Sequence, residues 1–251
     1  MLSGEFSLSE NIQDWKKEYS IILKDQTYKP NIKSPENFID DIKLKYLRKY
    51  LPKSGIVAEI GAGSGRLLTR IALENKDIIP IGIDFESSRM VKDNIDKFNL
   101  NGSSIRADAY HIPLKSNSVD AVISGGFLEH FSNKELEFII SEMKRILKPN
   151  GLFYAEIVPK KFSLCRPIIL TEMGGYESTL GMWEWRFILK FNGFKNVKVT
   201  SGIVVPPNFF IWFKSGILLE ITYKFKYLAE YIEDTFISDI FGFCYYVTAE
   251  K

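Results

Sequence analysis

Short apolar runs and longer amphipathic stretches alternate along the middle of the chain. Four runs are apolar almost throughout and have the lengths of strands buried on both faces: residues 56–60, 78–83, 121–123 and 152–158. Between them, apolar residues recur at helical spacing in three stretches: residues 67–72, 90–98 and 136–147. A shorter strand is expected at residues 104–107, which makes the run at 121–123 the fourth strand in chain order, and residues 148–151 are expected to form the turn before the fifth. This alternation predicts an α/β fold with a mainly parallel sheet flanked by helices.

Two helices are expected before the first strand. Ser7 and Glu10 have the spacing of a capping box, and apolar residues then recur at helical intervals over residues 10–23. Ser34-Pro35 begins a second helix, which Pro52 closes. We therefore expect the N-terminal helices (residues 1–53) and the α/β part (residues 54–251) to form one domain.

The first strand runs directly into the turn Gly61-Ala62-Gly63-Ser64-Gly65, which precedes a helix. Glycines permit positive φ and a close approach of the backbone to a ligand, and the first turn of a helix has amide groups that can act as donors. The spacing differs from the dinucleotide-binding pattern G-x-G-x-x-G, whose third glycine would fall on Arg66, and no phosphate-binding Lys-Ser or Lys-Thr follows. A simple tight turn between strand and helix is the alternative.

Asp84 follows the second strand, about 20 residues beyond the glycine turn, where a βαβ unit places an acid that binds ribose hydroxyls. Hydrogen bonds to a charged group contribute ~1.5–3 kcal/mol each. The alternative role for this residue is capping the helix that begins near Ser87-Ser88.

Composition and charge exclude several classes of protein. The chain has 251 residues, is 45% hydrophobic and 25% charged, and has a net charge of +2, which is too small an excess to indicate a nucleic-acid partner. Cys165 and Cys244 have neither metal-ligand spacing nor a disulfide pattern, so we expect no metal. Residues 1–10 do not resemble a signal peptide and no apolar run approaches the ~20 residues of a membrane span, so we expect a cytoplasmic location.

An acid two positions before G-x-G-x-G resembles the nucleotide-binding turn of class I S-adenosylmethionine-dependent methyltransferases. This resemblance covers about residues 56–158 and implies a Rossmann-like, seven-stranded, mostly parallel twisted sheet with an antiparallel last strand and helices on both faces. It also implies that S-adenosylmethionine is the cofactor. The residues that would bind it follow the strands of the sheet: Glu59, Gly61, Ala62, Gly63, Gly65, Asp84, Phe85, Asp108, Ala109, Ser124 and Gly125.

Two of these assignments carry specific roles. Glu59 would balance the methionine ammonium, and the alternative is a buried structural glutamate. The resemblance also implies that Asp108 and Ala109 contact the adenine. The alternative is that Asp108 is an exposed aspartate in a turn, which the sequence does not distinguish.

The segment after the fourth strand, Leu128-Glu129-His130, is similar to that of methyltransferases acting on quinones, sterols and other small acceptors. It lacks the Asn/Asp-Pro-Pro-aromatic motif of enzymes that methylate base amines, and neither cysteine follows a proline, as in cytosine-C5 enzymes. We therefore expect a small, apolar or aromatic acceptor. His130 is the candidate general base, because its unperturbed pKa near 6.5 suits neutral pH, although a histidine outside the pocket is equally compatible.

Two regions lie outside the resemblance. Gly202 to Gly242 is far longer than a hairpin loop of 2 to 5 residues, and it carries an aromatic run at 209–213 and an apolar helical stripe. It could pack on the domain, form a homodimer interface, cover an apolar acceptor or contact a membrane surface. In the family, leading helices often cover cofactor and substrate, which makes Trp15, Tyr19 and Tyr28 candidates for a lid.

Three other functions are compatible with such a sheet. An aminopropyl transferase would have extra acids after the fourth strand, and Ser124-Gly125-Gly126 supplies none. A protein methyltransferase and a non-catalytic cofactor-binding module both remain possible on sequence alone.

Overall fold

The structure is a computed structural model, and it describes residues 28–30, 34–158, 160, 180–204, 224, 231 and 235–251. The expected helix at residues 10–23, the lid candidates Trp15 and Tyr19, and most of the segment from Gly202 to Gly242 lie outside the described residues.

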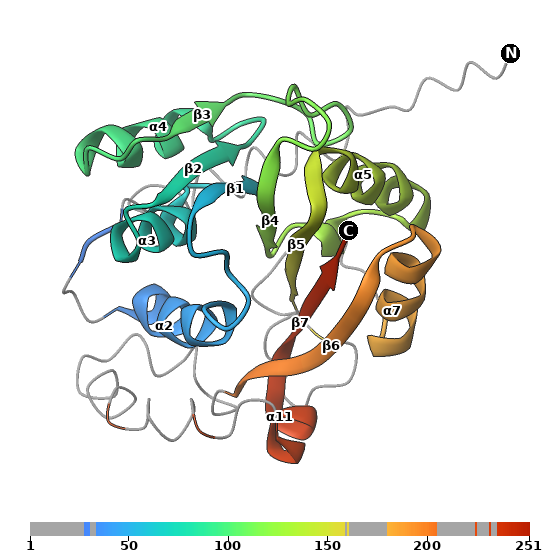
Figure 1. Cartoon of the computed structure of the whole chain (residues 1–251). Helices are drawn as coiled ribbons and strands as arrows, with labels where there is room; N and C mark the ends of the chain where they lie inside the picture. Colours follow the sequence, from blue (N-terminus) through green and yellow to red (C-terminus); the bar gives the residue numbers. More distant parts are fainter. Residues whose placement is uncertain are drawn as a thin grey trace, which may run out of the picture.

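A single seven-stranded sheet with the order β3-β2-β1-β4-β5-β7-β6 forms the centre of the described structure (Figure 1). Neighbouring strands from β3 to β5 run parallel, whereas β7 is antiparallel to both β5 and β6. The strands are β1 (Gly55–Ile60), β2 (Ile78–Ile83), β3 (Ser103–Ile105), β4 (Val119–Gly125), β5 (Leu147–Ile157), β6 (Lys195–Val204) and β7 (Gly242–Glu250). The fold predicted from the sequence is confirmed.

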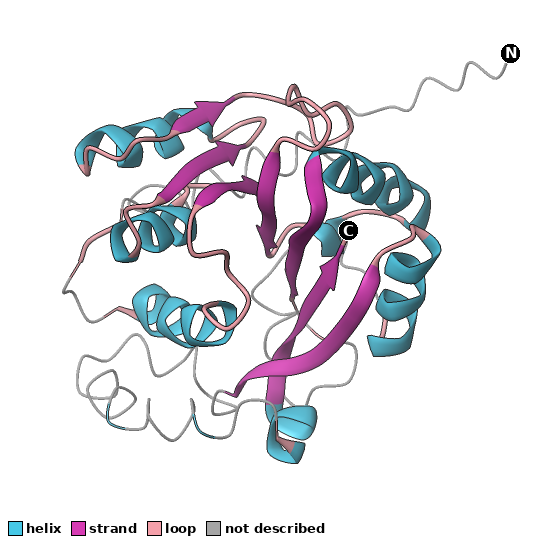
Figure 2. Ribbon diagram, viewed as in Figure 1, coloured by secondary structure: helices cyan, strands magenta, loops and turns pink. Residues whose placement is uncertain are grey.

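Helices cover both faces of the sheet (Figure 2). The described helices are α2 (Pro35–Leu47), α3 (Arg66–Glu74), α4 (Ser88–Lys97), α5 (Asn133–Ile146), α7 (Met182–Phe191) and α11 (Phe236–Phe241), with the short 3-10 turn η2 (Leu128–His130). Alternate residues of β1 belong to different buried clusters: Val57 to the one that includes residues of α2 and α3, and Ala58 and Ile60 to the one that includes residues of α5. The central strands β1 and β4 are therefore largely buried on both sides, which explains their continuous apolar runs.

The predicted cap at Ser34 is present, whereas Ser7 and Glu10 lie outside the described residues. The Ser34 hydroxyl accepts a hydrogen bond from the Asn37 amide at 3.1 Å, and Pro35 occupies the first turn of α2. At α5, Ser132 and Glu135 form a capping box in which the Ser132 amide donates to Glu135 Oε2 at 2.8 Å. These contacts satisfy amide groups that the helices leave without internal partners.

Strand β5 begins earlier than the predicted residue 152. Leu147 already pairs with Val119, and the register shifts before Leu152 pairs with Ala121. The residues between include Asn150 at φ 61°, the left-handed conformation that asparagine tolerates. The segment expected to be a turn is therefore an irregular start of the strand. Strand β3 is also shifted, covering residues 103–105 rather than 104–107.

Strands β6 and β7 form an antiparallel pair that extends from Lys195 and Glu250 to Val204 and Gly242. The long segment between them therefore connects two paired strand ends, as expected. No described helix is long and apolar enough to cross a membrane.

Candidate cofactor and active site

The glycine turn after β1 adopts a conformation that favours glycine at each of its three positions. Gly61, Gly63 and Gly65 have φ values of 67°, 54° and 69°. A Cβ atom on Gly61 would lie 2.3 Å from the ring of Phe127, so the backbone and this ring are in direct contact. The turn thus requires glycine for space as well as for conformation.

The amide groups of the turn already have partners within the protein. Gly61 and Ala62 donate to the Ile83 carbonyl at 3.0 and 3.1 Å, and Gly65 donates to the Ala62 carbonyl at 2.7 Å. These hydrogen bonds hold the turn against the end of β2, next to Asp84. The amides expected to act as donors to a ligand are those of the first turn of α3, and that role stays a prediction.

Asp84 links the glycine turn to helix α4. Its Oδ2 accepts a hydrogen bond from the Gly63 amide at 2.8 Å, and its Oδ1 accepts from Glu86 and Ser87 at 2.9 and 2.7 Å. These bonds stabilise the turn that leads into α4, whose N-cap residue is Ser87, so Asp84 supports the approach to the helix rather than capping it. Carboxylate oxygens can accept more than one hydrogen bond, so these contacts are compatible with ribose binding, which stays a prediction.

A buried cluster of charged side chains lies between α2, the glycine turn and the ends of β1 and β5. Arg66 forms two hydrogen bonds with Asp40, at 2.6 and 3.2 Å. Lys43 lies 2.6 Å from Glu156 Oε2, and the side chains of these two residues are 16% and 1% exposed. Burial lowers the pKa of Lys43, but attraction to Glu156 and Asp40 outweighs it and the pKa is raised.

Glu59 belongs to the same cluster and is 4% exposed. Burial, followed by the nearby Asp40, raises its pKa to about 8, although Lys43, a backbone hydrogen bond with Leu68 and Arg66 act in the opposite direction. Its Oε2 atom is buried and has no hydrogen-bond partner among the described residues. A buried carboxyl oxygen of this kind fits the predicted ammonium group, because a cation nearby would stabilise the ionised form.

The raised pKa of Glu59 leads to a prediction about stability. Between about pH 4.5 and 8 the folded chain binds more protons here than the unfolded chain, so the free energy of unfolding falls as pH rises. The loss is at most about 1.4 kcal/mol for each pH unit crossed. We expect Glu59→Gln to be more stable than the wild type at pH 8.5 and to match it at pH 4 in chemical denaturation. Identical pH slopes for the two proteins would contradict the shift.

The residues after β3 form a compact turn. The Asp108 carboxylate accepts a hydrogen bond from the Tyr110 amide at 3.0 Å, and Ala109 is 9% exposed. Phe85, which follows Asp84, is 43% exposed, and the Arg106 guanidinium lies 5.4 Å from its ring centre. The adenine contacts predicted for Asp108 and Ala109 and the cofactor contact predicted for Phe85 stay predictions.

Three residues at the end of β4 and just after it have structural contacts. The Ser124 hydroxyl is buried and donates to the Ile60 carbonyl at 3.0 Å, while Gly125 lies beside Glu156, whose Oε2 would be 3.5 Å from a Cβ there. Glu129 is fully buried and accepts a hydrogen bond from the Val158 amide at 2.9 Å, so it joins η2 to the end of β5. His130 is half-buried in η2. Its role as a base stays a prediction.

Three aromatic rings gather beside the glycine turn. Phe127, in contact with Gly61, lies 4.8 Å from Phe131 in an edge arrangement, and Tyr110 lies 6.2 Å from Phe131 at an interplanar angle of 88°. Burial and a hydrogen bond with Glu135 raise the pKa of Tyr110, so its phenol is protonated at neutral pH. We call Tyr110, Phe127 and Phe131 the aromatic cluster.

Most of these contacts have no signal in the amino-acid sequence. Asp40 and Lys43 lie on a helix that carries no recognisable functional motif. Phe127 directly precedes the Leu128-Glu129-His130 motif but was not predicted as a site residue. Glu156 gave one usable signal, an acid within an otherwise apolar strand, which normally requires a partner.

Tyr28, a lid candidate, lies against α3 and α4. Its amide donates to Asn94 Oδ1 at 3.3 Å. The centre of its ring lies 5.7 Å from that of Phe98 and 5.5 Å from the Arg70 guanidinium. Asn94 in turn donates to the Ser64 carbonyl at 2.8 Å, which connects Tyr28 to the glycine turn. The lid role itself stays a prediction.

The sheet order, the antiparallel β7 and a glycine turn joined to an acid at the end of β2 together define a class I methyltransferase fold. Residues 58–155 match a family model described as a methyltransferase domain. This match supports the class predicted from the sequence, the class I S-adenosylmethionine-dependent methyltransferases with S-adenosylmethionine as cofactor, over residues 58–155 of the chain.

Similar proteins include the tRNA (carboxymethyluridine(34)-5-O)-methyltransferase of Mus musculus, which is 34% identical over 104 residues. These residues make up 41% of this chain but only 14% of that protein. An uncharacterised protein of Methanocaldococcus jannaschii is 28% identical over 186 residues, covering 72% of this chain and 75% of the other.

Among solved structures, a SAM-dependent methyltransferase from Archaeoglobus fulgidus has a TM-score of 0.59 at 21% identity. The match covers 86% of this chain and 97% of that one. At this level of identity the likeness supports the fold alone.

Proposed function

We propose that this protein transfers a methyl group from S-adenosylmethionine to a small, apolar or aromatic acceptor. The observation that supports this acceptor class is the aromatic cluster, because its member Phe127 contacts Gly61 in the glycine turn expected to bind the cofactor and Phe131 and Tyr110 extend the cluster from there. Aromatic rings prefer edge and offset contacts with other flat apolar groups, so this cluster suits such an acceptor.

The cofactor supplies a methyl group already bonded to a positively charged sulfur, which makes an acid on the leaving group unnecessary. The task of the chain is then to hold the two reactants in line, and good alignment lowers a barrier by ~7–11 kcal/mol. In this proposal Asp84 holds the ribose, Glu59 the ammonium and Asp108 with Ala109 the adenine. The aromatic cluster orients the acceptor.

The same class of cofactor serves tRNA methylation, and the mouse relative is named as a tRNA methyltransferase. The net charge of +2 gives little support to an RNA-binding surface on this chain. Methyl transfer from labelled cofactor should be measured with small aromatic and aliphatic acceptors, with bulk tRNA and with peptide. Transfer to tRNA alone would overturn the small-molecule assignment, and cofactor binding without any transfer would indicate a non-catalytic module.

We expect His130→Ala to lower turnover by ~10²–10⁴-fold if the acceptor must lose a proton, because the proton then lacks its base. The affinity for S-adenosylhomocysteine should change less than twofold. The matched control is His111→Ala, since His111 is the other histidine of the chain and lies exposed in a loop. A turnover and pH profile for His130→Ala equal to those of the control would remove His130 as the base.

A further inference from the structure

Helix α7 exposes a stripe of aromatic residues on the face opposite the core. Trp183, Phe187 and Phe191 recur every four residues and are 76%, 68% and 69% exposed, whereas Trp185 and Leu189 are buried beneath them. The rings of Phe187 and Phe191 are stacked, with centres 6.0 Å apart. Exposed aromatic surface of this extent marks an interaction site more often than chance exposure.

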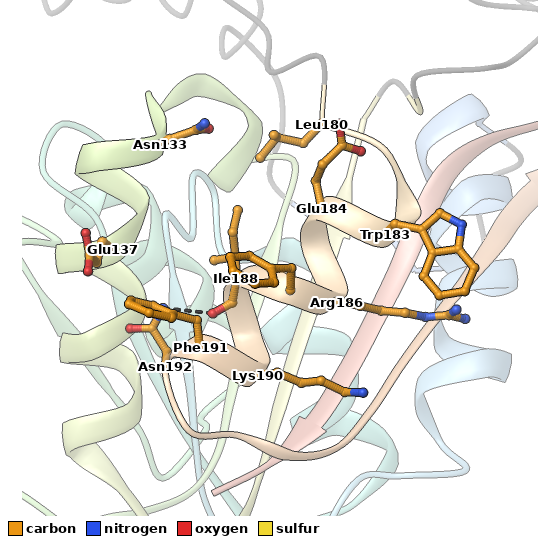
Figure 3. A pocket seen from close by; sticks show the side chains of 11 residues that line it. Asn133, Glu137, Leu180, Trp183, Glu184, Arg186, Ile188, Lys190, Phe191 and Asn192 are labelled. Carbon is orange, nitrogen blue, oxygen red and sulfur yellow. Dashed lines mark hydrogen bonds between the residues drawn. The ribbon is translucent and has the colours of Figure 1, made fainter.

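A groove of about 720 Å³ accompanies the stripe, between α7 and the beginning of α5 (Figure 3). Its apolar lining includes Leu180, Ile188 and Phe191, and Asn133 and Glu137 come from α5. The groove and the stripe form one continuous surface, which we call the α7 face.

The α7 face has two edges of opposite charge. Glu184 and Glu137 lie on the side toward α5, whereas Arg186 and Lys190 point to the other side (Figure 3). On a helical wheel, Glu184 and Lys190 lie symmetrically on either side of the position of Phe187. A single apolar stripe with an acidic and a basic edge is complementary to itself.

We infer that a second copy of this chain docks on the α7 face, with the two α7 helices packed in parallel about a two-fold axis along their length. This arrangement sets the acidic edge of each copy on the basic edge of the other, as in parallel coiled coils, and places Phe187 against its own equivalent. Antiparallel packing would instead bring like edges together. The acidic edge also disfavours an anionic membrane surface as the occupant.

The test is sedimentation equilibrium of the full chain from about 1 to 200 µM, and the expected result is a reversible dimer. Phe187→Glu should raise the dissociation constant of the dimer at least tenfold, because each copy then places a negative charge at the centre of the interface. The matched control is Phe138→Glu on α5, since Phe138 is 61% exposed and does not line the groove. A wild-type monomer throughout, or equal dimerisation of Phe187→Glu and the control, would overturn the inference.

Lys190→Glu tests the orientation. In parallel packing it places an acid on the acidic edge of the other copy, so dimerisation should weaken severalfold and low salt should increase the difference. In antiparallel packing the two basic edges would face each other, so Lys190→Glu would replace facing positive charges with facing negative ones. An unchanged dissociation constant would overturn the parallel arrangement.

Discussion

Replacing Lys43 with methionine should destabilise the protein by about 3–5 kcal/mol at pH 8. The side chain lies 2.6 Å from Glu156, which is 1% exposed, and its removal would leave a buried carboxylate without its cation. Burial already raises the pKa of Glu156, and Lys43 only partly offsets this effect. Without Lys43 the pKa should rise further, so Glu156 would bind a proton and the loss of stability should be smaller at pH 5.

Chemical denaturation at pH 5 and pH 8 measures this prediction. The double variant Lys43→Met with Glu156→Gln should recover most of the stability, because neither charge is then buried alone. Lys45→Met is the matched control, since Lys45 is an exposed lysine on the same helix. An equal effect of Lys43→Met and Lys45→Met would show that the pair does not stabilise the fold.

Replacing Asp84 with alanine should weaken the binding of S-adenosylhomocysteine at least tenfold. The predicted ribose contact would be lost, at ~1.5–3 kcal/mol for each hydrogen bond to a charged group. The variant also loses the contacts with Gly63, Glu86 and Ser87, which hold the glycine turn and the start of α4 in place. The loss of the ribose contact and the loosening of the turn both lower the affinity for S-adenosylhomocysteine.

Calorimetry with Asp84→Ala and Asp84→Asn separates the two effects. Asparagine retains one oxygen that can accept from the amides but lacks the charge, so it should recover more of the unfolding temperature than of the affinity. Unchanged affinity in Asp84→Ala would exclude Asp84 from the cofactor site. Weakened affinity that follows the loss of stability in both variants would assign Asp84 a purely structural role.

Apolar spacing and helix caps predicted the fold well because both depend on residues that are close together in the sequence. Apolar runs such as residues 121–123 are buried on both faces because they lie in the centre of the sheet, and Ser34-Pro35 sets a helix start through contacts a few residues apart. The irregular start of β5 was not predicted, because the pairing of Leu147 with Val119 depends on a strand distant in sequence.

The sequence alone determined the order of strands and helices, the glycine turn and the acids that follow the strands, because spacing along the chain decides each of them. The tertiary structure decided which side chains meet. Lys43 and Asp40 on α2 reach Glu156 on β5 and Arg66 on α3, Phe127 reaches Gly61, and Asp84 accepts hydrogen bonds from Gly63. No periodicity encodes such pairs, because burial, pKa and ring contacts depend on neighbours that only the folded sheet brings together.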